Sequence, residues 1–145
     1  GRIYFNHGVA NPDFLRVGGK DIEGTFVPTS PVVVAAALPA DHPAKAQATE
    51  YVKRYEAANG AGSVSAFGAY TWDAGLLLSR AIPVALKSAQ PGTKEFRSAL
   101  RDAIEATRDL PVSNGVMNMS KNDHLGLDQR ARVIVKVDGG KWKLD

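Results

Sequence analysis

The chain has 145 residues, of which 44% are hydrophobic and 23% charged, a composition typical of a globular domain. Its net charge is only +3, and the 18 basic residues are scattered among 15 acidic ones, which argues against a nucleic-acid groove. It has no cysteine, which excludes disulfides and thiol catalysis, and no apolar run approaches the roughly 20 residues of a membrane-spanning helix.

The first third of the chain predicts short elements separated by glycine and proline. Ile3–Phe5 is typical of a buried strand but begins at once, without Met or a signal peptide, so we expect a fragment whose upstream part is missing. Asn11 is expected to cap a short helix from Pro12 to about Val17. A strand is predicted at 25–27, whereas the valines at 32–34 leave helix and strand open.

Capping residues and apolar periodicity predict three helices in the middle of the chain. They are a helix capped by Asp41 and ending near Ala58, a helix at 65–88 kinked by Pro83, and a helix at 94–107 capped by Thr93. After these we expect a short strand at 116–119 and a hairpin of strands 132–137 and 141–144. Strands mixed with helices of this length predict the α/β class, with a C-terminal β-hairpin.

Residue patterns that carry chemistry are scarce. None of His7, His42 and His124 has a second ligand at the spacing of a metal site, and no Gly-x-Ser-x-Gly nucleophile motif or phosphate-binding loop occurs. Gly60-Ala61-Gly62 follows a helix instead of a strand, so it does not indicate a dinucleotide site. We therefore expect a protein that is not an enzyme, with no catalytic residues, no metal and no cofactor.

Four segments, taken in order, carry a family resemblance. They are Tyr4–Pro12, Gly19–Gly24, Tyr70–Leu77, and Val133–Val137 with Gly140–Trp142. Together they resemble the C-terminal part of an ABC-transporter substrate-binding protein of the branched-chain amino acid family, over nearly the whole chain. The resemblance implies a type I periplasmic binding fold, in which two α/β lobes joined by a hinge trap a ligand in the cleft between them.

The resemblance also implies how the chain is divided between the lobes. Residues 1–58 would belong to the C-terminal lobe, 59–128 would be a segment of the N-terminal lobe with hinge crossings, and 129–145 would return to the C-terminal lobe as a strand and hairpin. The remainder of the N-terminal lobe is expected to be absent.

Five residues are candidates for the ligand site. The acid of the Glu23-Gly24 pair matches the family position that receives a ligand ammonium group, although a solvated loop acid is the simpler interpretation of Glu23 alone. His7 and Gly8 follow a strand, at an end where ligands bind in open α/β sheets. Tyr70 and Trp72 begin the long helix, and at least one of them is expected to pack in the core.

The expected function is solute binding for an ABC importer, outside the cytoplasm, with a permease as the partner. The resemblance implies a small amphipathic ligand such as a branched-chain or other hydrophobic amino acid. Two kinds of alternative stay open. The ligand could instead be an aromatic or other organic acid or an amide, and the chain could instead be a sensory domain of the same fold or, less readily, an enzyme fragment. The apolar stripe Phe67–Ile82 further predicts a homo-oligomer of this chain, formed by domain swapping or simple association.

Overall fold

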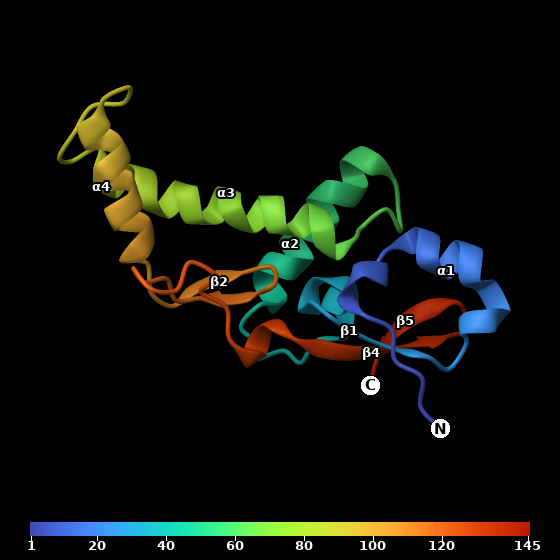
Figure 1. Cartoon of the computed structure of the whole chain (residues 1–145). Helices are drawn as coiled ribbons and strands as arrows, with labels where there is room; N and C mark the ends of the chain where they lie inside the picture. Colours follow the sequence, from blue (N-terminus) through green and yellow to red (C-terminus); the bar gives the residue numbers. More distant parts are fainter.

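The computed structural model describes all 145 residues and shows two parts, which we call the body (residues 1–64 and 129–145) and the arm (residues 65–128) (Figure 1). The body contains η1 (His7–Val9), α1 (Pro12–Gly18), η2 (Gly19–Ile22), β1 (Phe26–Thr29), η3 (Pro31–Ala37), α2 (Lys45–Asn59), η4 (Gln129–Ala131), β4 (Val133–Asp138) and β5 (Lys141–Leu144). The arm contains α3 (Ala66–Ala85), α4 (Lys94–Glu105), β2 (Leu110–Val112) and β3 (Gly115–Met117). No helix combines the length and apolar character needed to cross a membrane.

The body is built on a three-stranded antiparallel sheet in the order β1-β4-β5. The predicted hairpin is confirmed: β4 and β5 pair around Gly139-Gly140, with Val137 opposite Trp142. Val135 and Val137 are fully buried, while Ile134, which precedes Val135, is exposed, as the alternating pattern of this strand predicts. β1 pairs with the other edge of β4, which places Thr29 opposite Val133.

The predicted buried strand at Ile3–Phe5 is wrong in its burial. Tyr4 forms an isolated parallel bridge with Phe26, and Phe5 N–H donates to the Phe26 carbonyl at 2.9 Å. Pairing occurs on this one side only, so the other edge is open, and Ile3 and Tyr4 are 62% and 54% exposed.

Two of the three predicted helix caps are confirmed. Asn11 Oδ1 accepts a hydrogen bond from Phe14 N–H at 3.0 Å, and Thr93 Oγ1 accepts one from Phe96 N–H at 3.1 Å. The Asp41 cap is wrong, because α2 begins at Lys45 after an extra turn and has no side-chain cap.

The hydrophobic core lies in the body, where the valine run forms η3 and packs against α2. Two 3₁₀ turns meet at Val34, whose φ of −126° and ψ of 34° lie outside the helical range. Ten buried residues form one cluster: Ala10, Val27, Val32, Val34, Ala35, Leu38, Ala48, Tyr51, Ala69 and Val135. Only Ala69 comes from the arm.

The arm consists of α3, α4 across its far end, and the β2–β3 hairpin (Figure 1). Strand β2 was not predicted, because it has three residues and Pro111 at its centre. The turn of this hairpin is held by Asp73 of α3: Oδ1 accepts from Ser113 N and Oγ at 2.7 and 2.6 Å, and Oδ2 accepts from Asn114 N and Nδ2 at 3.1 and 2.7 Å. Burial raises the pKa of the Asp73 carboxyl, although these hydrogen bonds lower it.

Candidate functional site

A cavity of about 370 Å³ lies where the carboxyl end of β1 meets the start of β4, between the body and the arm. We call it the His7 cavity. Its lining residues are His7, Pro28, Thr29, Ser30, Tyr70, Leu125, Leu127, Asp128, Ala131 and Arg132. Both parts of the chain therefore contribute walls to a space large enough for a small molecule.

His7 and Tyr70, predicted from segments far apart in the sequence, meet in this cavity. His7 begins η1, which starts where the chain leaves its pairing with β1, and Tyr70 lies in the second turn of α3. Tyr70 Oη lies 3.0 Å from His7 Nε2 and 3.0 Å from Ser30 Oγ. The phenol hydroxyl thus links the first turns of the arm helix to two polar side chains of the body.

Thr29 is a wall residue whose buried hydroxyl has no hydrogen-bond partner. It lines the His7 cavity and is only 2% exposed, yet its Oγ1 has no hydrogen-bond partner. A buried hydroxyl without a partner costs about 1–3 kcal/mol, but Thr29 Oγ1 is itself closed to solvent, so it is not a group that a ligand in the cavity reaches.

The uncommitted charge in the cavity wall is positive. Asp128 accepts hydrogen bonds from Arg130, with Nη2 at 2.6 Å from Oδ2, and this bonding lowers the pKa of Asp128. Arg132 forms no ion pair or side-chain hydrogen bond within the chain. The lining of the cavity therefore includes a free guanidinium together with the imidazole of His7 and the hydroxyls of Tyr70 and Ser30.

Glu23 does not line the His7 cavity. It lies at the end of η2, where its Oε2 and Oε1 accept hydrogen bonds from Gly139 N at 3.1 Å and Gly140 N at 2.6 Å. The carboxylate thus holds the turn between β4 and β5, at the opposite end of β4 from the cavity. A contact between Glu23 and a ligand stays a prediction.

Trp72 and Gly8 also lie apart from the cavity lining. The Trp72 ring lies 5.9 Å from the Tyr51 ring and under the Arg54 guanidinium, so it packs against α2. This agrees with the expectation that at least one of the two α3 aromatic residues has a packing role. Gly8 is next to His7 in η1, where its N–H donates to Asn6 Oδ1 at 2.8 Å.

Ser30 and Arg132 were not singled out in the sequence. Each lies just outside a strand, and their proximity depends on the antiparallel pairing of β1 with β4, over about a hundred residues of chain. The only local signal was their position at strand ends, where ligand groups often lie.

No protein-family model matches the sequence, and no curated protein is similar enough to count as a match. Solved structures do match. An extracellular ligand-binding receptor from Rhodopseudomonas palustris is 40% identical with a TM-score of 0.95, over 100% of this chain and 40% of that one. The chain has a type I periplasmic binding fold. A periplasmic binding protein type 1 from Bordetella pertussis (18% identical, TM-score 0.72, 99% of this chain and 38% of that one) shares it.

A leucine binding protein from Thermotoga maritima shares this binding fold too, at 22% identity and a TM-score of 0.67, over 100% of this chain and 36% of that one. These matches confirm the resemblance and the fold predicted from the sequence. The chain spans about 40% of the length of its Rhodopseudomonas relative. These relatives are named as ligand-binding proteins rather than enzymes, which fits a cavity that contains hydrogen-bond donors and a cation.

Proposed function

We propose that the His7 cavity is part of the ligand site of an extracytoplasmic solute-binding protein, and that it binds a small organic carboxylic acid without an amino group. The binding-protein fold and the names of the similar structures support the general role. The extracellular relative supports a location outside the cytoplasm, and a similar structure from Rhodospirillum rubrum, named as a putative branched-chain amino acid ABC transporter, supports an ABC permease as the partner. We keep the lobe assignment as part of this proposal, with residues 1–58 and 129–145 in the C-terminal lobe and 59–128 in the N-terminal lobe.

The single observation that carries the choice of ligand is the charge of the cavity wall. Arg132 is free, whereas Asp128 is occupied by Arg130 and Glu23 by the hairpin turn. An amino acid brings an ammonium group, which needs an ionised partner when it leaves water. The cavity has no free carboxylate for that purpose, so the organic-acid alternative is favoured over a hydrophobic amino acid.

The polar groups suit a carboxylate bound from two sides. A guanidinium such as that of Arg132 can donate two parallel hydrogen bonds to a carboxylate, and Tyr70 can donate a third when its hydroxyl turns from His7. Pro28, Leu125 and Leu127 provide apolar surface for the remainder of the ligand. Because the contacts come from the body and the arm, a bound acid would hold the two together, as in closure around a ligand.

Two compounds that differ only in the amino group test this proposal. We expect 4-methylpentanoate, titrated into the ¹⁵N-labelled chain, to shift the NMR signals of His7 and Tyr70, and leucine to leave them unchanged. Arg132→Gln should weaken 4-methylpentanoate binding about tenfold, since hydrogen bonds to charged groups contribute roughly 1.5–3 kcal/mol. Lys20→Gln, a change outside the cavity, is the matched control. Equal shifts with leucine, or none with either compound, would contradict the proposal.

A further inference from the structure

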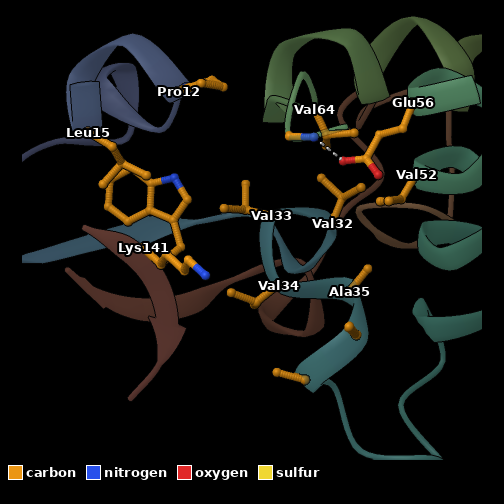
Figure 2. Close-up of a pocket in the computed structure, with 14 residues that line it drawn as sticks. Pro12, Leu15, Val32, Val33, Val34, Ala35, Val52, Glu56, Val64 and Lys141 are labelled. Atoms are coloured by element: carbon orange, nitrogen blue, oxygen red, sulfur yellow. Dashed lines mark hydrogen bonds between the residues drawn. The ribbon is translucent and has the colours of Figure 1, made fainter. Parts of the chain in front are cut away.

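We propose a second ligand site in a cavity of about 450 Å³ between α1, η3, α2 and β5, specific for an aliphatic carboxylate whose charged end faces Lys141 (Figure 2). We call it the valine cavity. Its main apolar walls are Leu15, Val32, Val33, Val52, Val64 and Trp142. It shares no lining residue with the His7 cavity, so this inference is independent of the function proposed above.

The shape of η3 brings three consecutive valines to this cavity. In a regular helix successive side chains point about 100–120° apart, so three in a row do not share one face. The break between the two 3₁₀ turns falls at Val34, and Val32, Val33 and Val34 all line the cavity. Figure 2 shows them between α1 on one side and α2 on the other.

Trp142 forms a rigid part of the wall. Its ring stacks on Phe14 of α1, with 5.9 Å between ring centroids and an angle of 3° between the planes. An indole held by stacking does not need to reorder when an apolar ligand enters, which keeps the entropic cost of binding low. Trp142 is also a reporter placed at the cavity itself.

Groups of opposite charge lie on opposite sides of the cavity. The Lys141 ammonium has no partner within the chain, whereas Lys143, two residues further along β5, pairs with Asp138 at 2.8 Å. Glu56 lies on the opposite side of the cavity, where one oxygen accepts from Gly62 N at 2.8 Å and the other has no partner (Figure 2). The Lys141 ammonium therefore attracts the carboxylate of a ligand, whereas a second carboxylate at the other end of the ligand would be repelled by Glu56.

Apolar walls with a few placed polar groups are the usual composition of a small-molecule site. The walls of the valine cavity are aliphatic, which suits an unbranched or branched alkyl chain. The free cation selects a carboxylate over a neutral head group, and Glu56 rejects a dicarboxylate. The combination distinguishes three compounds of equal length: octanoate, octan-1-ol and octanedioate.

Trp142 fluorescence tests the site in a Trp72→Phe background, where Trp142 is the one remaining tryptophan. We expect a saturable change with octanoate, and at least fivefold weaker binding of octan-1-ol and octanedioate. Lys141→Gln should reduce octanoate affinity to that of octan-1-ol. Lys143→Gln is the matched control on the same strand and should leave the affinity unchanged.

Two further variants test whether the fluorescence change arises from binding in the valine cavity. Val33→Phe should fill the space and abolish the response, and Arg132→Gln, in the His7 cavity, should leave it intact. The absence of a saturable change with octanoate would overturn the proposal. So would equal affinity for octanoate and octan-1-ol, or an equal effect of Lys141→Gln and Lys143→Gln.

Discussion

The body and the arm differ in how far they bury their apolar side chains. The body surrounds its own core, in which Val27 and Val135 are fully buried. In the arm, helix α4 has no buried residue. Six apolar side chains along and just after α3 are between 37% and 51% exposed. They are Phe67, Tyr70, Leu78, Ile82, Val84 and Leu86. One part of this chain thus encloses a core to which the arm adds only Ala69, while the other presents an apolar surface that further protein can cover.

The largest expected effect comes from Asp73, which ties α3 to the β2–β3 turn. Asp73→Ala removes the acceptor of four buried hydrogen bonds and leaves their donors unpaired, which should cost ~3 kcal/mol or more. Hydrogen exchange should show faster exchange in the arm and unchanged protection in β1, β4 and β5. Asp102→Ala, on the exposed surface of α4, is the control. An equal loss of protection in both parts would show that body and arm unfold as one unit.

A pair of truncations compares the two parts directly. Val135→Ala opens a cavity in the body core and should lower the free energy of unfolding by about 2 kcal/mol. Leu78→Ala, at a side chain 40% exposed on α3, should change it by less than about 0.5 kcal/mol. Urea titrations of both variants give these values, and similar costs would mean that the α3 surface is already covered in solution.

Association of the chain is predicted from the same exposed surface. Light scattering should give a mass above the 15.4 kDa of one chain, increasing with concentration. Leu78→Lys combined with Ile82→Lys should reduce the mass to that of a monomer. A wild-type chain that stays monomeric at high concentration would contradict this prediction.

Tyr70→Phe should weaken the link between arm and body by about 1 kcal/mol, because it removes the hydroxyl that contacts His7 and Ser30. Chemical-shift changes should be concentrated at His7 and at the start of α3. Tyr55→Phe, on α2, is the control variant. Changes spread evenly over the chain would argue against a local link at this point.

The pH dependence of stability gives a further test at Asp73. Because burial raises the pKa of Asp73, the native state keeps a proton on this carboxyl at a pH where the unfolded chain has lost it. The free energy of unfolding should therefore fall as pH rises from about 4 through the raised pKa, by no more than ~1.4 kcal/mol per pH unit. The slope should be absent in Asp73→Asn, and an unchanged slope in that variant would assign it to another group.

Local patterns predicted the parts of the fold that depend on local physics. The β4–β5 hairpin follows from alternating valines and the Gly139-Gly140 turn, and Asn11 and Thr93 cap the helices that they precede. The three-residue strand β2 and the late start of α2 were missed, because they depend on partners elsewhere in the chain rather than on propensity.

The same distinction holds for the site. His7 and Tyr70 were candidates individually, but their contact joins positions 63 residues apart. Arg132 becomes part of the site only through the pairing of β1 with β4, which no local pattern specifies. Glu23 contacts the Gly139-Gly140 turn, at the opposite end of β4 from the cavity. Its match to a family motif therefore could not establish which of the predicted residues share a cavity.

Intermolecular NOEs between 4-methylpentanoate and the chain would show whether the ligand lies between body and arm in the His7 cavity. We predict NOEs from the ligand methyl groups to Leu125 and Leu127 of the arm and to Pro28 of the body. NOEs confined to the residues around Glu23 and the Gly139-Gly140 turn would contradict the account.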